Sequence, residues 1–313
     1  MPDFKKTLNL SELLEAKTQI EDIEFWRNLC PQAKISDIAL NRAKALRVDA
    51  AQIQDYQSVL RAEGYFQTPP MLPVEMQQEM LACIEAVKMA GFPQMFALVY
   101  DVFYEAFHYF DNILRSMLGE DYKMIPNFWI YYVPAAEGGK GFEPHRDLEY
   151  LNTIDAQGNP TVLTLWVTVT DANPLNSCMY VLPSHRDPEY KAAITNLKQG
   201  ATLFKLEDVR AIPVAGGALS AWDQYLYHWG SRGSVRASHA RVSYALYCQR
   251  GDMAPVDDSW IDLRTDLGFA DRLGFICRGI YRYSYVKSDP TQQTPELLAF
   301  LEKHLKSIEL QPV

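Results

Sequence analysis

The sequence is poor in cysteine and contains no closely spaced pair of cysteines. Its 313 residues include five cysteines, an odd number at wide spacings, and no CxxC motif occurs. Zinc knuckles and thioredoxin-type redox sites are built from such motifs, so the sequence excludes both classes of site. We expect reduced thiols that are mostly buried in the core.

The chain also lacks a surplus of positive charge. Its formal net charge is −9, and no run of lysine and arginine is interleaved with aromatic residues. Proteins that bind nucleic acid present a basic surface to the phosphate backbone, and this composition offers none. We therefore expect no nucleic-acid partner.

Long apolar runs are absent as well. The first residues, MPDFKKTLNLSELLEAK, lack the apolar core of a signal peptide, and no stretch approaches the roughly 18 apolar residues that a membrane span requires. These absences predict a cytoplasmic protein without a membrane partner. With 48% apolar residues, the chain can bury one large core without disulfides or structural metal ions. The oligomeric state stays open.

Helical patterns dominate the first 120 or so residues. Apolar residues at helical spacing follow Ser11, which can cap a helix, and further helices are expected at about 49–63 and 73–90. The segment 95–118 has too many apolar residues for an exposed helix. We expect it to form a scaffold helix against the main sheet and to end at Gly119.

From about residue 124 the sequence changes to short runs rich in β-branched and aromatic residues. These runs are MIPNFWIYYVP, TVLTLWVTVTD, CMYVLP, GGALSAWD and RVSYALYC. Strands at this spacing without intervening helices predict an antiparallel sandwich, barrel or jelly roll. A Thr-Pro start in TPELLAFLEKHLKSI predicts one closing helix.

One predicted strand, 161–170, has two different faces. Thr164 and Trp166 belong to a mixed polar face, and the residues between them form an aliphatic face. In an ordinary sandwich the polar face meets water, whereas in a ligand-holding barrel it lines the lumen. The pattern alone leaves both arrangements open.

Two metal-binding side chains stand two residues apart, at His145 and Asp147, on the same face of an extended segment. This pair alone is a weak signal, but His228 follows, and Arg241 opens a strand thirteen residues later. Two histidines and one carboxylate leave three adjacent positions on an octahedral iron(II), which suits a chelating 2-keto acid and dioxygen. An arginine nearby supplies a bidentate fork for the far carboxylate of that acid.

In this order the motifs resemble the phytanoyl-CoA dioxygenase family of iron(II)- and 2-oxoglutarate-dependent oxygenases, over about 49–290. SVLRAEGYF resembles the opening helix and its turn, and PHRD matches the first two iron ligands. The remaining matches are the long central signature LTLWVTVTDANPLNSCMYVLPSHR, the second-histidine segment IPVAGGALSAWDQYLYHWGS and the arginine strand ARVSYALYC.

The resemblance implies a mainly β protein with flanking helices around a double-stranded β-helix, which is a jelly roll of the cupin-like type. It also implies the domain organisation. The expected parts are an N-terminal helical extension (1–48), an oxygenase domain (49–290) and a C-terminal helix (291–313). Within the oxygenase domain we expect helical support (49–120), the double-stranded β-helix (about 121–255) and a lid or C-terminal segment (256–290).

The resemblance assigns His145, Asp147 and His228 as iron ligands and Arg241 as the anchor of 2-oxoglutarate. The family often has a serine two residues after the second histidine, but this chain has Gly230 there. Other candidates for the cosubstrate pocket are Ser231, Ser243, Thr164 and Trp166. Strand parity from Arg241 also places Ser243, Ala245 and Tyr247 on one inward face.

Candidate substrate residues come from the aromatic and basic segments around the predicted barrel. In FWIYY, the alternation does not decide whether Trp129 and Tyr131 or Phe128, Ile130 and Tyr132 face inward. The segment CRGIYRYSYVK either closes over the substrate or forms a solvated edge. The candidates are Tyr131, Tyr132, Tyr150, Trp229, Arg278 and Arg282.

We expect an enzyme that uses iron(II), 2-oxoglutarate and dioxygen to oxidise a small molecule, most often by hydroxylation, while 2-oxoglutarate is decarboxylated to succinate. Natural-product or amino-acid-derivative biosynthesis would suit the aromatic density. Alternatives on the same scaffold are desaturation, cyclisation, oxidative N-dealkylation, or an acyl-CoA substrate, which the negative charge disfavours. A non-catalytic cupin-type binding module is the alternative outside enzymes.

Overall fold

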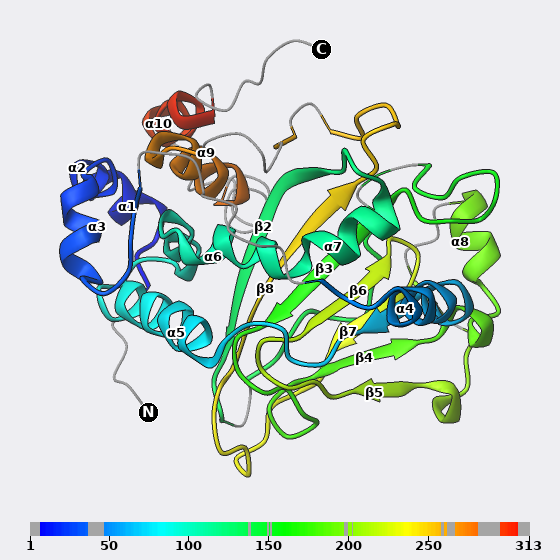
Figure 1. Ribbon diagram of the computed structural model, residues 1–313. Coiled ribbons are helices and arrows are strands. Elements are labelled where there is room, and N and C mark those ends of the chain that lie inside the picture. Colours follow the sequence, from blue (N-terminus) through cyan, green and yellow to red (C-terminus); the bar gives the residue numbers. More distant parts are fainter. Residues whose placement is uncertain are drawn as a thin grey trace.

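The computed structural model describes residues 7–36, 47–136, 139–148, 150, 152–196, 200–201, 203–257, 260–261, 267–280 and 295–305. Two antiparallel sheets form its centre, and helices cover the outer face of the larger sheet (Figure 1). This arrangement confirms the predicted jelly-roll architecture with flanking helices.

The larger sheet has the strand order β1-β6-β3-β8-β2, and each neighbouring pair is antiparallel. Its strands are β1 (Tyr65–Gln67), β6 (Leu219–Asp223), β3 (Val162–Thr168), β8 (Arg241–Gln249) and β2 (Lys123–Val133). The aliphatic residues of β3 and β8 join the main hydrophobic core with the helices, as Leu165 and Leu246 do. The opposite face of the larger sheet turns toward the smaller sheet and carries the polar side chains.

The smaller sheet has the order β5-β4-β7, with β5 (Arg210–Ile212), β4 (Met179–Leu182) and β7 (Tyr227–Gly230). An isolated antiparallel bridge between His145 and His228 adds the HRD segment to the free side of β7. The sequence patterns did not predict β1, β5 or β7, because strands of three or four residues are defined by their partners and not by alternation.

Most helices precede β2 or follow β8 in the chain, and α8 lies between β4 and β5. They are α1 (Leu10–Glu15), α2 (Lys17–Ile20), α3 (Ile23–Leu29), α4 (Ala50–Glu63), α5 (Val74–Met89), α6 (Val102–Glu105), α7 (Phe107–Leu118), α8 (Tyr190–Asn196), α9 (Phe269–Gly279) and α10 (Pro295–Leu305). Short 3-10 helices are η1 (Gln94–Val99), η2 (Ser184–Arg186) and η3 (Leu206–Asp208). In Figure 1, α6 and α7 cross the strands of the larger sheet.

The prediction of one continuous helix over 95–118 is wrong, because the chain divides there into η1, α6 and α7. Tyr100 is extended, and the N–H of Asp101 donates to the carbonyl of Lys34 at 2.9 Å. Arg272 on α9 also pairs with the buried carboxylate of Asp101 at 2.5 Å. These tertiary contacts outweigh the helical pattern at the break. The end at Gly119 is confirmed.

The N-terminal helices pack into the same core as the rest of the molecule. Trp26 on α3 is fully buried and stacks on Phe96 with ring centroids 5.3 Å apart. The cap of α1 is Asn9, not Ser11 as predicted, because Asn9 and Glu12 form a reciprocal capping box. The division of the chain into an extension, a domain and a closing helix stays a prediction.

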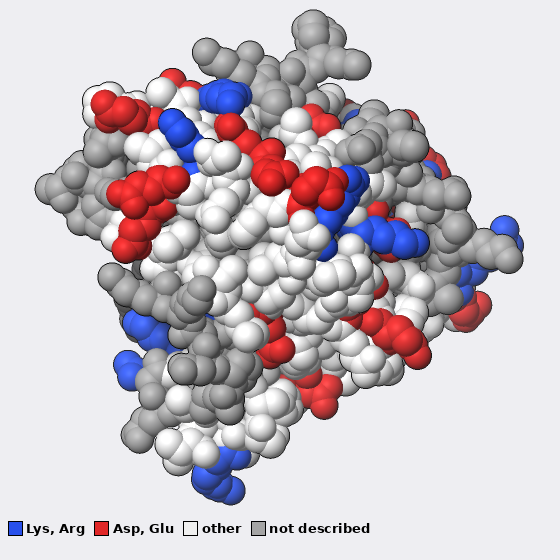
Figure 2. All heavy atoms as spheres, turned by 90° about the vertical axis from the view of Figure 1, so that its left-hand side faces the viewer, with Lys and Arg blue, Asp and Glu red and all other residues white. Residues whose placement is uncertain are grey.

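Surface charge and cysteine burial agree with the composition. All five cysteines are unpaired and buried. On the face in Figure 2, acidic side chains surround a broad uncharged area, and described lysines and arginines lie mostly toward its edges. Of the described helices, none is long and apolar enough to cross a membrane.

Candidate metal and cosubstrate site

The backbone brings the two candidate histidines together. The N–H of His145 donates to the carbonyl of His228 at 3.0 Å, and the reverse hydrogen bond measures 2.9 Å. The imidazole centroids lie 4.4 Å apart. Ligand atoms of His145, Asp147 and His228 all lie within 4.8 Å of one another, so one ion can contact all three.

Each histidine is oriented by a backbone carbonyl two residues before it. Nδ1 of His145 lies 2.6 Å from the carbonyl of Glu143, and Nδ1 of His228 lies 2.9 Å from that of Leu226. With Nδ1–H donating to the carbonyl, Nε2 carries the lone pair that a metal ion needs. Burial lowers the pKa of His228 to about 4, so this ring is neutral near pH 7.

Asp147 is held by two hydrogen bonds from the larger sheet. The hydroxyl of Thr164 and the indole N–H of Trp222 donate to its Oδ2 at 2.8 and 2.9 Å. Burial alone would raise the pKa of Asp147. At the low pH where this carboxyl titrates, His228 is protonated, and its charge, together with the contacts from His145 and Trp222, holds the pKa of Asp147 well below its ordinary value. The carboxylate is therefore ionised and fixed, as a metal ligand must be.

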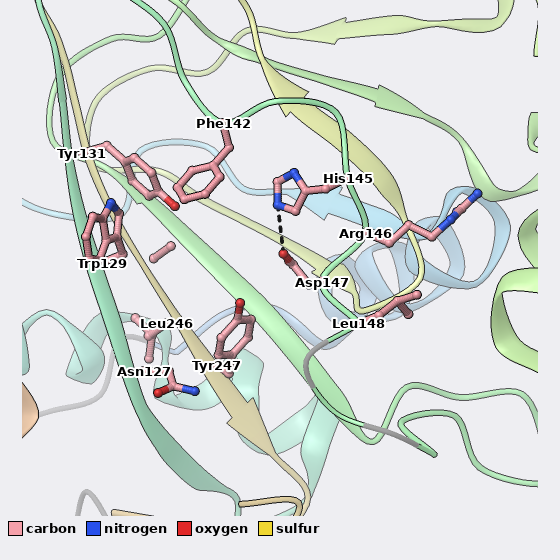
Figure 3. A pocket seen from close by; sticks show the side chains of 11 residues that line it. Asn127, Trp129, Tyr131, Phe142, His145, Arg146, Asp147, Leu148, Leu246 and Tyr247 are labelled. Atoms are coloured by element: carbon pink, nitrogen blue, oxygen red, sulfur yellow. Dashed lines mark ion pairs between the residues drawn. The ribbon is translucent and has the colours of Figure 1, made fainter. Parts of the chain in front are cut away.

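Arg146, between the two ligands, points away from the cavity (Figure 3). Its guanidinium is fully buried, pairs with Asp187 at 2.7 Å and donates to the carbonyl of Tyr225. In an extended segment, alternate side chains take opposite directions. Fixing Arg146 on one side therefore fixes His145 and Asp147 on the other.

Arg241 is a buried cation without a carboxylate partner among the described residues. Its guanidinium donates to the hydroxyl of Ser243 at 2.7 Å and to the carbonyl of Ser177 at 3.0 Å. Trp166 also donates to Ser243 Oγ, at 2.9 Å, and its ring lies beside the guanidinium. Burial lowers the pKa of Arg241 to about 10, which leaves it charged at neutral pH. A buried charge without a protein counterion suits an anionic ligand.

Close backbone packing explains why position 230 is a glycine and not the serine that the family often has. A Cβ on Gly230 would lie 2.6 Å from the Cα of Gly141, so no side chain fits there. A Cβ on Gly141 would in turn lie 3.1 Å from Nη2 of Arg241. Ser231 has a buried hydroxyl without a hydrogen-bond partner among the described residues, and it does not line the cavity. Ser243 therefore is the serine that contacts the guanidinium.

His145, Asp147 and His228, which could hold a metal ion, lie between two connected parts of one cavity. The inner part, about 410 Å³, reaches from the metal ligands to Arg241 and Trp166. The outer part, about 760 Å³, is lined by aromatic side chains and Asn127 (Figure 3). Residues that line both parts are Tyr131, Phe142, His145, Asp147, Ala245 and Tyr247. Both volumes include space that is open to solvent.

The lumen-facing direction of Thr164 and Trp166 agrees with the structure, as does the inward parity of Ser243, Ala245 and Tyr247. On β2, Trp129 and Tyr131 face the cavity, which answers the question that the alternation in FWIYY left undecided. Tyr132 faces the other side, where Lys88 of α5 lies 4.9 Å from its ring centroid, so its assignment to the substrate is wrong.

Other substrate candidates lie behind the cavity wall or away from it. Trp229 stacks on Tyr180 on the outer side of the smaller sheet, so its assignment is also wrong. Tyr150 donates to Asp257 at 2.9 Å, which also pairs with Arg278. Neither Tyr150 nor Arg278 is among the residues that line the cavity.

Arg282 lies outside the described residues. Three residues that line the cavity were not predicted from the sequence, namely Trp222, Asn127 and Phe142. Trp222 could have been found, since it directly precedes the Asp-Gln pair of the second-histidine segment.

A model of the family described as "Phytanoyl-CoA dioxygenase (PhyH)" matches residues 60–235, more than half of the chain. The chain belongs to the phytanoyl-CoA dioxygenase family. It is therefore an enzyme of the iron- and 2-oxoglutarate-dependent type, and this excludes the non-catalytic binding module. No curated protein matches the chain.

Solved structures with this fold are similar at low sequence identity. The non-heme monooxygenase ThoJ in its apo form is 17% identical with a TM-score of 0.53, over 81% of this chain and 100% of that one. Its nickel complex is 18% identical with a TM-score of 0.51, over the same shares. The epimerase SnoN, in complex with Fe3+, alpha ketoglutarate and nogalamycin RO, is 16% identical with a TM-score of 0.47, over 67% and 94%.

Proposed function

We propose that this phytanoyl-CoA dioxygenase family member hydroxylates a small molecule, with iron(II) held by His145, Asp147 and His228 and 2-oxoglutarate anchored by Arg241. Two features of one cavity carry the proposal. A cluster of three metal-binding side chains lies at one end, and at the other lies a buried guanidinium that has no carboxylate partner among the described residues. A dicarboxylic keto acid has one end for each.

The donor set fits iron(II). Two imidazoles and one carboxylate form the facial arrangement that leaves positions open for a chelating keto acid and dioxygen. Bound iron(II) would supply the reduction of dioxygen, coupled to decarboxylation of 2-oxoglutarate to succinate and carbon dioxide and to oxidation of the substrate. A carboxylate at position 147 leaves no ligand place for a halide, which disfavours halogenation.

The chain's own residues bind and orient. Ser243 fixes the guanidinium of Arg241, so its fork is ordered before a carboxylate arrives. Thr164 and Trp222 hold Asp147, and Gln224 donates to the Thr164 hydroxyl at 2.7 Å. Trp166 and Tyr131 flank the guanidinium and exclude water from it. This order keeps the cosubstrate in one pose beside the ligands.

The metal assignment is tested with His145→Ala and with His185→Ala as matched control, because the exposed ring of His185 contacts Glu63 and the carbonyl of Ala62 and does not line the cavity. We expect wild type and the control to bind Ni(II) and to release succinate from 2-oxoglutarate with iron(II). His145→Ala should do neither. Equal metal binding by His145→Ala would contradict the assignment.

The anchor is tested with Arg241→Lys, which keeps the charge but removes the fork, and with Arg210→Lys as control on the exposed strand β5. We expect 2-oxoglutarate affinity of the Ni(II)-loaded protein to fall about 10- to 100-fold, the loss of one charge-assisted hydrogen bond. Ni(II) affinity should stay within about threefold, because Arg241 contacts no metal ligand. Equal losses of both would refute the anchor.

Hydroxylation is proposed as the reaction because the outer cavity places a substrate beside the metal ligands. Desaturation, cyclisation and oxidative N-dealkylation use the same site, and the mass of the product separates them. An acyl-CoA is disfavoured, since the described lining offers no cation for its phosphates other than Arg146, which points away. Natural-product or amino-acid-derivative metabolism remains part of this proposal.

A further inference from the structure

The strand pairings place Ala245 between two tryptophans on the floor of the cavity. On one side Ala245 pairs with Trp129 of β2, and on the other with Trp166 of β3. Paired residues of adjacent strands point to the same face, with Cβ atoms about 5 Å apart. The smallest inward side chain of β8 therefore stands between two indole rings.

The paired residues before and after Ala245 on the same face of the sheet enclose this position along the strand direction. Two residues before Ala245, Ser243 pairs with Tyr131; two residues after it, Tyr247 pairs with Thr164. Aromatic side chains reach diagonally across such rows. Ala245 and Tyr247 line both the inner and the outer part of the cavity. The methyl group of Ala245 thus leaves a recess with aromatic walls, beside the metal ligands.

The lining of the outer cavity carries polar groups but little charge. Its charged side chains among the described residues are His145 and Asp147, assigned to the metal, and Arg146, whose guanidinium is buried against Asp187. The hydroxyl of Tyr131 borders the cavity without a hydrogen-bond partner among the described residues. The amide of Asn127 lies at the far end and donates to the hydroxyl of Tyr150. The Tyr131 hydroxyl suits a hydroxyl or carbonyl oxygen of a ligand.

We propose that the outer cavity binds an uncharged, flat ring system that bears hydroxyl or carbonyl groups, with one ring in the recess above Ala245. Ala245 is then the residue that determines how closely the substrate approaches the metal ligands. The inference rests on the proposed function for the metal and the cosubstrate. The aromatic rings of Trp129 and Tyr247, which line the cavity, favour a planar ring over a linear chain, because stacked rings gain more contact per side chain.

The test uses the Ni(II)-loaded protein with 2-oxoglutarate and two probes. The first, 1-naphthol, is an uncharged flat bicycle with a hydroxyl group, and the second, octanoyl-coenzyme A, is a charged linear thioester. Calorimetric titration measures both probes against wild type, Ala245→Gly, Ala245→Val and Ala245→Leu. Trp129→Leu removes a flat wall, and Tyr132→Leu is its matched control because Tyr132 faces the opposite side of β2.

We expect 1-naphthol to bind wild type and Ala245→Gly, about tenfold more weakly to Ala245→Val, and more weakly still to Ala245→Leu. Trp129→Leu should also weaken it, and Tyr132→Leu should not. Octanoyl-coenzyme A should not bind. Thermal unfolding identifies any variant that does not fold. If Ala245→Leu does not fold, the affinity of Ala245→Val for 1-naphthol tests the inference.

Three results would overturn the inference. The first is no binding of 1-naphthol to wild type, and the second is preferred binding of octanoyl-coenzyme A. The third is a loss of 2-oxoglutarate affinity that follows the loss of 1-naphthol affinity across the series, which would assign Ala245 to the cosubstrate. Failure of wild type to bind Ni(II) or 2-oxoglutarate would instead refute the proposed function, while 1-naphthol binding without them still reports the recess.

Discussion

Arg146→Met tests whether the buried ion pair with Asp187 contributes to the free energy of unfolding and to the position of the metal-binding side chains. The change removes one partner of an ion pair whose side chains are both fully buried, and it leaves Asp187 charged without its counterion. Breaking a buried pair in this way costs about 3–5 kcal/mol. A domain has about 5–15 kcal/mol in total, so the loss should be large and easily measured by urea unfolding.

The double variant Arg146→Met/Asp187→Leu provides the matched control. Replacing both charges with apolar side chains should restore most of the lost free energy of unfolding. We expect the Ni(II) affinity of both variants to be lower than that of wild type. Both variants lack the hydrogen bond from Arg146 to the carbonyl of Tyr225, which holds the HRD segment. If the free energy of unfolding of Arg146→Met lies within about 0.5 kcal/mol of that of wild type, the buried ion pair does not hold the HRD segment in place.

Three further changes test neighbouring contacts. Gly141→Ala should push the segment away from Gly230 and lower 2-oxoglutarate affinity with little change in Ni(II) affinity, and equal affinities in calorimetry would contradict this. Trp222→Phe removes a donor to Asp147 and should lower Ni(II) affinity about 10- to 100-fold, whereas unchanged affinity would show the bond to be dispensable. Burial raises the pKa of Asp223 from 3.8 to about 6, so its contribution to stability is complete below pH 4 and is lost as pH rises through 6. Asp223→Asn should remove about 3 kcal/mol of that pH dependence in urea unfolding, and parallel curves would count against it.

The sequence predicted the long elements and their faces well. Strands β3 and β8 alternate over seven and nine residues, so the inward side of Thr164 and of Ser243 follows from parity. The order of His145, His228 and Arg241 along the chain also carried enough information to bring them to one cavity. These features depend on local pattern and chain order, which a single sequence contains.

Features that depend on distant partners could not be predicted. On β2 the register shifts between Ile125 and Trp129, around Pro126. In FWIYY both faces carry large apolar or aromatic side chains, so the alternation did not tell which face lies toward the cavity. Tyr131 and Tyr132 were therefore both candidates, and only the pairing with β8 places Tyr131 inward.

The ion pair between Arg146 and Asp187 joins two motifs that the sequence shows only separately. Asp187 directly follows the LPSHR end of the central signature, and Arg146 is the middle residue of the HRD segment. Neither residue has a reason to be charged and buried until the fold brings them together. Only three-dimensional proximity reveals this link.

In the proposed function, strand β8 carries both Arg241, which anchors the cosubstrate, and Ala245, which limits the approach of the substrate. Arg241 and Ala245 are four residues apart, about 14 Å along a strand, and both point inward. The pairing with β2 and β3 holds both positions in register. A substitution at Ala245 therefore reshapes the floor under the substrate without moving the guanidinium or Ser243.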